Sequence, residues 1–228
     1  MCEFKLLIRN VMSLPTDKMS RIIPLFLTLS KETSMNPPLV PVSYDVALST
    51  FPANHVIDVR VSLVIKAPSG SGSVMRMYLG IPDMNIFHVR EAKIDGTTAA
   101  YTYENPNLDL HLPFPLEPGD VARVDLAYRG RVNSPKNYTG VRGTELMGEG
   151  LWLPTVCFPG PKFDLNMVTE VPEGESTAAP GQPVSTRTRG GRTITVWKSD
   201  VSVMSVTFLS GPFRVKSGAA GGLEVVAM

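Results

Sequence analysis

Apolar and polar residues alternate along short stretches of this chain from about Pro41 onward. The alternating stretches are Val42–Leu48, Val56–Lys66, Val74–Leu79, Phe87–Ile94, Ala99–Tyr103, Leu108–Pro113 and Val121–Gly130. Side chains of a β-strand point alternately to opposite faces, so a period of two indicates strands with one buried face. Turn signals recur roughly every eight to twelve residues, which is typical of sandwiches. The pattern therefore predicts an all-β fold of two packed, mainly antiparallel sheets.

The second half of the chain continues this pattern with one interruption. Further strands are expected at Phe163–Val171, on both sides of Gly190-Gly191, at Val201–Phe208 and at Gly211–Val215. Residues 133–150 have no clear period, and they contain the sequon Asn137-Tyr-Thr. Without a period of either 2 or 3.6 residues, this segment is predicted to be a loop.

The composition changes near both ends of the chain. Residues 1–37 mix apolar and polar runs without a strand period and predict a leader that is disordered or weakly helical. Residues 38–216 carry the strand pattern and predict the β-sandwich domain. Residues 217–228 form a glycine-rich tail, in which Leu223–Met228 can supply a short last strand. A length of 228 residues is consistent with one main folded domain.

The leader leaves the cellular location open. Met19 is followed by Ser-Arg and then by mostly apolar residues, the order found in a secretory signal if translation starts there. Pro24 interrupts this run, and no small-x-small cleavage site follows it. A cytoplasmic protein is slightly favoured, and a secreted or periplasmic protein is the alternative. No stretch approaches the roughly 20 apolar residues that a membrane helix needs, so no transmembrane segment is expected.

Charge and cysteine usage exclude several classes of partner and framework. The chain has 22 basic and 21 acidic side chains, a net charge of +1, so no nucleic-acid partner is expected. Its only cysteines are Cys2 and Cys157, too few for a disulfide framework. The 20 prolines and 19 glycines favour short strands joined by tight turns.

The sequence contains no recognisable catalytic constellation. Its three histidines, His55, His88 and His111, show no His-Glu-x-x-His spacing, and no Gly-x-Ser-x-Gly is present. They are interpreted as surface or turn residues, with convergence on a metal as the alternative. Cys157 lies between Val156 and Phe158, an apolar setting that raises a thiol pKa and makes it a poor nucleophile. We expect no catalytic residue, no metal site and no cofactor.

Several motifs together carry a resemblance to a known family. The stretch from Glu149 to Pro172 has a Trp152-x-Pro corner, a Phe-Pro-Gly-Pro segment starting at Phe158 and a strand that ends in Val-Pro. About forty residues later, Phe208 begins Phe-Leu-Ser-Gly-Pro-Phe. Upstream, Leu116-Glu-Pro-Gly-Asp is followed by a strand that ends in Ala-Tyr-Arg-Gly. Residues 41–216 thus resemble the N-terminal β-domain, or saddle domain, of zinc aminopeptidases of the aminopeptidase N family.

This resemblance implies a non-catalytic domain that packs against a peptidase catalytic domain. The zinc would belong to that other domain. In the family, an acidic or amide side chain of the β-domain helps to hold the substrate amino group. Glu149 and Glu145 occupy that neighbourhood, although the family's Thr-Gln-x-Glu pattern is absent. The alternative for both is a solvated loop carboxylate.

The resemblance also predicts an apolar surface for a partner around Trp152 and Phe158. Through it the chain would bind a catalytic domain or self-associate, because an isolated saddle would leave such residues less covered. The alternative interpretation of the same aromatic residues is that they pack in the core of the domain itself. A second function class stays open: an independent β-sandwich module that binds a protein or a carbohydrate through its loops.

Overall fold

The computed structural model describes residues 39–81, 85–156, 160–213, 216–220 and 223–227. The predicted leader, Cys157 and Phe158 lie outside these residues. The chain divides into two units between Asn36 and Pro37, and the second extends to Met228. Within the described residues there is no α-helix, only the short 3-10 turns η1 (Pro52–Asn54) and η2 (Gly148–Gly150). The expected all-β class is confirmed.

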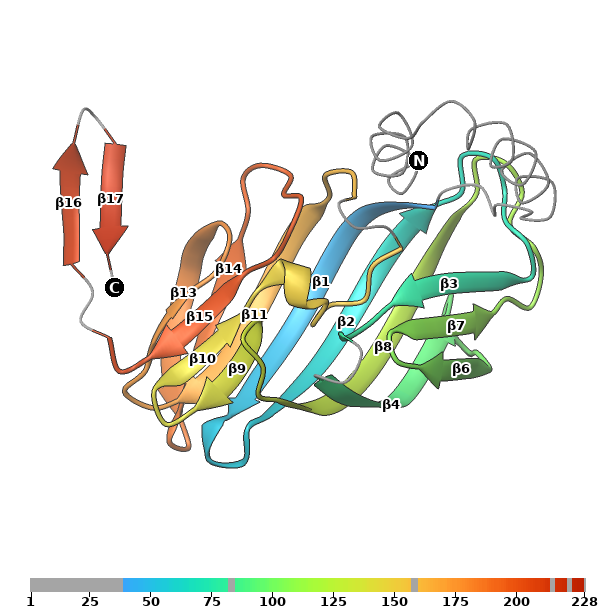
Figure 1. Cartoon of the computed structure of the whole chain (residues 1–228). Helices are drawn as coiled ribbons and strands as arrows, with labels where there is room; N and C mark the ends of the chain where they lie inside the picture. The colour runs from blue at the N-terminus through green and yellow to red at the C-terminus, as the bar shows by residue number, and fades with distance from the viewer. Residues whose placement is uncertain (1–38, 82–84, 157–159, 214–215, 221–222, 228) are drawn as a thin grey trace, which may run out of the picture. The chain divides into compact units, whose positions relative to one another are not determined.

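The largest element is an eight-stranded sheet with the order β13-β14-β11-β1-β2-β8-β4-β5 (Figure 1). Its strands are β1 (Val40–Phe51), β2 (Val56–Lys66), β4 (Asn85–Ile94), β5 (Thr97–Thr98), β8 (Val121–Val132), β11 (Asp164–Pro172), β13 (Gln182–Arg189) and β14 (Arg192–Lys198). Neighbouring strands are antiparallel except β1 and β11, which pair in parallel. This pair joins the two halves of the chain in one sheet.

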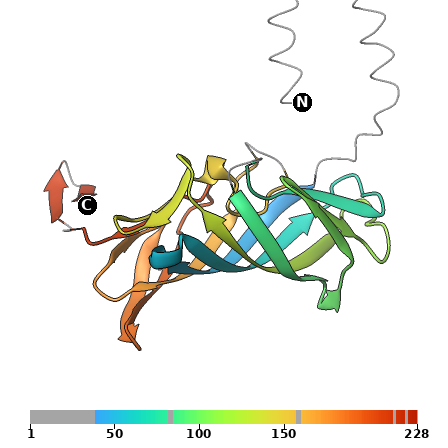
Figure 2. The ribbon, with the colours of Figure 1, turned by 60° about the horizontal axis from the view of Figure 1, so that its bottom comes forward.

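Two smaller sheets cover one face of the large sheet. The three-stranded sheet has the order β3-β7-β6 and consists of β3 (Val74–Tyr78), β6 (Tyr101–Glu104) and β7 (Asn107–His111). The four-stranded sheet has the order β12-β15-β10-β9 and consists of β9 (Asn137–Gly140), β10 (Gly143–Leu146), β12 (Ser176–Ala178) and β15 (Phe208–Gly211). Figures 1 and 2 show both on the same side of the large sheet. The layer that faces the large sheet therefore consists of two separate sheets.

Alternation along the central strands explains the layering. In β2, every second residue from Ile57 to Ile65 is buried, and the residues between them are partly or fully exposed. The buried positions of all three sheets form one continuous apolar cluster. Phe87 of β4 packs edge-on against Tyr128 of β8, with their ring centroids 5.4 Å apart. The free face of the large sheet carries the polar residues, as the period of two requires.

Several sequence-based assignments are wrong. In the predicted strand Gly211–Val215, Gly211 ends β15, and Pro212 and Phe213 lie outside any strand. The segment 133–150, predicted to be a loop, contains β9, β10 and η2. Its alternation is hidden because the inward-facing side chains include Asn137, Thr139 and Thr144, which are polar but buried. In the opposite direction, the predicted strand Val201–Phe208 does not form, and β15 begins only at Phe208. Before it, Val203 makes a single bridge with Phe163.

The last strands are β16 (Lys216–Ala220) and β17 (Leu223–Ala227), which pair with each other as an antiparallel hairpin. The glycine-rich tail thus contributes one strand more than its sequence suggests. Among the residues that the structure describes, no helix has the length and apolarity needed to cross a membrane.

Candidate functional site

The β9–β10 hairpin positions the first of the two predicted carboxylates. Glu145 of β10 lies opposite Tyr138 of β9 on one side and Leu209 of β15 on the other. Cross-strand partners point to the same face of a sheet. Because Thr144 and Leu146, on either side of Glu145, are buried, Glu145 points away from the core. Glu145 is exposed, in keeping with this orientation.

Buried polar contacts fix this hairpin from its inner side. The hydroxyl groups of Thr139 and Thr144 are 2.7 Å apart and hydrogen-bonded. The Asn137 amide donates to the Gly150 carbonyl oxygen at 2.7 Å, and its Oδ1 accepts from the Met147 backbone N–H at 3.2 Å. Asn137 therefore joins β9 to η2. Its side chain is buried, so the sequon is not accessible for modification in this fold.

Glu149, the second predicted carboxylate, lies in η2 next to this hairpin. Its Oε1 is 3.4 Å from the Nζ of Lys136, and both side chains are about half exposed. An exposed ion pair of this kind is screened by solvent and contributes little to stability. The Glu149 carboxylate thus remains available to a ligand, but the structure does not bring it into the hollow that Glu145 lines.

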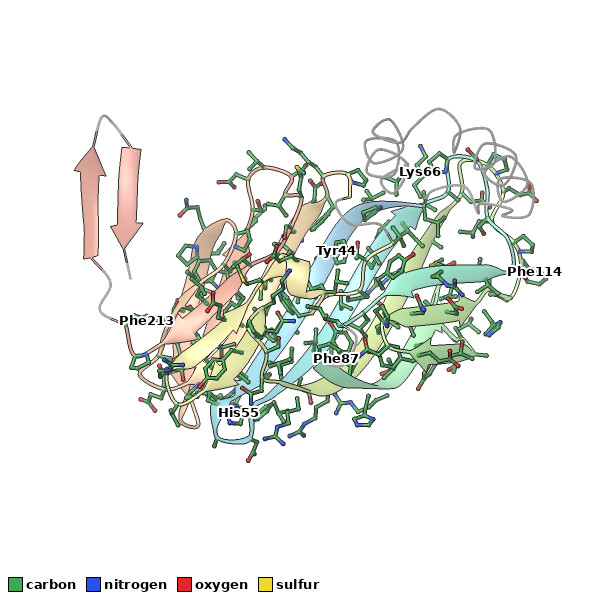
Figure 3. The ribbon with its side chains drawn as sticks, in the orientation of Figure 1. Tyr44, His55, Lys66, Phe87, Phe114 and Phe213 are labelled. Atoms are coloured by element: carbon green, nitrogen blue, oxygen red, sulfur yellow. The ribbon has the colours of Figure 1, made fainter. Side chains whose placement is uncertain are left out.

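A hollow of about 440 Å³ lies on the outer side of the four-stranded sheet. Glu145, Tyr138, Arg142 and Phe213 are among its lining residues. The Arg142 guanidinium carbon lies 5.8 Å from the centroid of the Tyr138 ring, a cation–π contact. Phe213 is 40% exposed, and Figure 3 shows it beside the four-stranded sheet. Sequence reasoning missed Arg142 and Tyr138, because it assigned residues 133–150 to a loop. It missed Phe213 because this residue was placed in an expected strand with no link to Glu145.

Gly143 lines this hollow, and two further glycines support its aromatic side chains. Gly143 has φ of +123°, and a Cβ there would lie 2.1 Å from the carbonyl oxygen of Ser210. A Cβ on Gly211 would lie 2.7 Å from the Phe213 ring, and a Cβ on Gly140 would lie 2.1 Å from the Tyr138 hydroxyl. Both aromatic rings therefore rest directly on glycine backbone. A side chain at any of these glycines would displace an aromatic side chain of the hollow or the β15 backbone at Ser210.

The predicted partner surface needs a correction. Trp152 has an exposed fraction of 0%, and its indole Nε1 donates to the Val206 carbonyl oxygen at 3.0 Å. Its own carbonyl oxygen accepts a 2.6 Å hydrogen bond from the Tyr128 hydroxyl. Trp152 thus belongs to the core of this chain, as the alternative interpretation held, and is not a surface for a partner. Phe158 lies outside the described residues.

A second hollow, of about 660 Å³, lies on the free face of the large sheet. Small or apolar residues such as Ala47 and Val168 and several charged residues line it. These charges largely pair with each other: Arg123 Nε is 3.0 Å from Asp125 Oδ1, and Lys93 contacts Glu91. After this pairing, neither positive nor negative charge is clearly in excess in the hollow. Its charge therefore does not indicate a class of ligand.

The three histidines occupy separate parts of the fold. His55 follows η1, and its Nδ1 is 2.5 Å from the Thr139 carbonyl oxygen. His88 lies in β4 of the large sheet and His111 in β7 of a small sheet. The described part of the chain contains no group of three His, Cys, Asp or Glu side chains that could hold a metal ion. The described residues therefore do not fit a zinc site.

Comparisons with known proteins match the fold. A scan against protein-family models finds no match, and a search of curated proteins finds none either. Among solved structures, the chain is similar to an M1 zinc metallopeptidase from Deinococcus radiodurans, with a TM-score of 0.69 and 20% identity over 80% of this chain and 44% of that chain. A variant of that enzyme bound to a Tyr-Ser-Ala substrate gives a TM-score of 0.68 and 21% identity, over 83% of this chain and 46% of that chain.

A two-domain M1 zinc metallopeptidase bound to L-arginine gives a TM-score of 0.69 and 20% identity, over 83% of this chain and 46% of that chain. The chain thus spans less than half the length of the structures it resembles. At this level of identity, the likeness establishes the fold: an all-β arrangement that these metallopeptidases contain as one part. It is the fold that the sequence motifs predicted.

Proposed function

We propose that this chain is the non-catalytic β-domain of an M1-type metallopeptidase, present in a truncated, split or stand-alone form, and that it assists a peptidase catalytic domain. The observation that carries this proposal is how much of each chain the structural match includes. Four-fifths of the chain superpose on less than half of each peptidase structure, with a TM-score of 0.69. More than half of each of those structures has no counterpart in the sequence given.

The proposed role is to hold the substrate, through the exposed carboxylates beside the four-stranded sheet. When bound in a catalytic domain, zinc would supply the activation of water for peptide hydrolysis. Glu145 would accept hydrogen bonds from the free amino group of a peptide, since an exposed carboxylate in a hollow suits an ammonium group. Glu149, on the adjoining turn, is the second candidate for this role.

The test uses the native assembly. An antibody raised against the recombinant chain would isolate the native protein from its source cells, and mass, zinc content and hydrolysis of aminoacyl arylamides would be measured. We expect either a longer polypeptide or a tightly bound second one, about one zinc per assembly, and hydrolysis that a chelator abolishes. A native protein of 24.8 kDa that brings down no second polypeptide, no zinc and no hydrolysis would contradict the proposal.

A variant in the same assembly tests the role of the carboxylate. Glu145→Gln keeps the shape of the side chain and removes its charge. A charge-assisted hydrogen bond contributes about 1.5–3 kcal/mol, so kcat/KM should fall about 10- to 100-fold, mainly through KM. Glu173→Gln, an exposed carboxylate in the turn after β11, is the matched control and should leave kcat/KM unchanged. Equal kinetics for both variants would remove Glu145 from the proposal.

A second candidate function, an independent binding module, is favoured by the burial of Trp152. The fully covered indole indicates that this part of the core is complete without a partner domain. If the native protein is found as the 24.8 kDa chain alone, the binding-module function becomes the better account.

A further inference from the structure

The hollow beside β10 brings together two charges of opposite sign that form no ion pair with any described residue. Arg142 and Glu145 both line it. Six ion pairs are found among the described residues, and neither side chain belongs to any of them. The only contact of the Arg142 side chain found in the described structure is with the Tyr138 ring. Among the described residues, neither charge is therefore taken up by an ion pair, and each can bind a ligand group of the opposite charge.

The hairpin places both charged residues next to the same tyrosine. Tyr138 is the direct cross-strand partner of Glu145, and the Arg142 guanidinium lies over its ring. Facing residues of two strands lie about 5 Å apart, so Tyr138 is the shared neighbour of the cation and the carboxylate. Tyr138 in turn rests on Gly140, where a side chain would collide with its hydroxyl. This arrangement keeps Arg142 and Glu145 in one hollow without pairing them.

We propose that this hollow binds a short peptide with both termini free. Its ammonium group would contact Glu145 and its carboxylate would contact Arg142, whose planar guanidinium suits bidentate contact with a carboxylate. The assignment of the ammonium group to Glu145 rests on the proposed function. The carboxylate site on Arg142 is independent of it and names the substrate class: di- or tripeptides, in which both charged ends lie close enough to reach one hollow.

Size and surroundings favour this class over others. A volume of about 440 Å³ lies within the roughly 300–1,000 Å³ range of small-ligand sites. Leu209 and the exposed Phe213 ring add apolar surface for side chains of the peptide. A multiply charged anion would be repelled by Glu145, and a simple cation by Arg142. A ligand that carries one charge of each sign satisfies both residues.

The proposal is tested on the full chain by isothermal titration calorimetry with the dipeptide L-alanyl-L-phenylalanine. The N-acetylated and the C-amidated forms of the same dipeptide are titrated in parallel. We expect the free dipeptide to bind and each blocked form to bind at least about tenfold more weakly, because each lacks one charge-assisted contact. Arg142→Gln should lose the discrimination against the amidated form, and Glu145→Gln the discrimination against the acetylated form.

Matched controls are Arg187→Gln and Glu173→Gln, which change exposed charges in β13 and in the turn after β11. Both should bind like the unchanged chain, and thermal unfolding would verify that all four variants fold. No binding of the free dipeptide up to about 10 mM, or equal affinity for the amidated form, would overturn the inference. Dipeptide binding by a native protein that has no zinc peptidase would support it while contradicting the proposed function.

Discussion

The indole nitrogen of Trp152 donates a hydrogen bond to the backbone carbonyl of Val206, and the Tyr128 hydroxyl donates one to the carbonyl of Trp152. Tyr128 belongs to the large sheet, and Val206 lies just before β15 of the four-stranded sheet. One residue outside both sheets therefore connects the two layers. Its burial is complete, so its side chain acts as core, and its indole nitrogen and its backbone carbonyl each make one of the linking hydrogen bonds.

The first prediction concerns this link. Trp152→Ser should lower the free energy of unfolding by about 4 kcal/mol, because it removes a fully buried aromatic side chain together with its hydrogen bond. Phe114→Ser is the control, since Phe114 is 79% exposed, and it should change stability by less than about 0.5 kcal/mol. Urea unfolding followed by circular dichroism measures both. Equal losses for the two variants would show that Trp152 is not core.

The second prediction concerns Gly143, which lines the hollow. Gly143→Ala should destabilise the chain by about 3 kcal/mol or more, because φ of +123° is strained for alanine and its Cβ would collide with the Ser210 carbonyl oxygen. Gly190→Ala is the matched control. Gly190 also has a positive φ, +59°, but no heavy atom lies within 4 Å of the added Cβ, so only the backbone strain of about 1 kcal/mol remains.

Thermal and urea unfolding of the two glycine variants distinguish collision from strain. If both variants lost the same stability, the close approach of β10 to β15 at Gly143 would not contribute, and the role of Gly143 in the hollow would have to be revised.

The third prediction concerns alkaline pH. Burial raises the pKa of Tyr103 from 10.0 to about 12, and its hydroxyl donates to the Leu79 carbonyl oxygen at 2.9 Å. Since the folded chain disfavours the phenolate, this residue's contribution to stability is complete below pH 10 and is lost as the pH rises towards about 12. Tyr103→Phe should cost about 1 kcal/mol at neutral pH, through the lost hydrogen bond.

Urea unfolding between pH 10 and about 12 checks whether stability falls with rising pH, as predicted. The stability of the Tyr103→Phe variant should fall less steeply with pH than that of the unchanged chain, so the two curves should approach each other. Burial also raises the pKa of Tyr44 and Tyr128, and these residues are common to both proteins. If the two plots of stability against pH ran parallel, Tyr103 would not contribute to the loss of stability at alkaline pH.

The strand pattern of this chain could be read from sequence where apolar residues face the core. In β2 and β11, every second residue is buried and most of these are apolar, so alternation located the strands and the all-β class followed. The method failed at β9 and β10, where buried Thr139 and Thr144 satisfy each other by a hydrogen bond. A polar residue that is buried with a partner looks, in sequence, like one that faces water.

The carboxylate Glu145 was named from the sequence, but its surroundings were not. Tyr138 and Arg142 lie within seven residues of it, yet nothing local indicates that a cross-strand pair and a cation–π contact bring all three together. Phe213 comes from a segment 68 positions later, and β15 carries it to the same hollow. Pairing of this kind depends on strand order, which a period of two does not encode.

What the sequence by itself determined is therefore local: the strands with apolar inner faces, the turns between them, and the absence of a His-Glu-x-x-His motif. The tertiary structure decided that Trp152 is core, that β1 and β11 pair in parallel, and that Arg142 and Glu145 share one hollow unpaired. The physical reason is that alternation records only which face a side chain takes. Which strands become neighbours is set by the packing of all layers around one core.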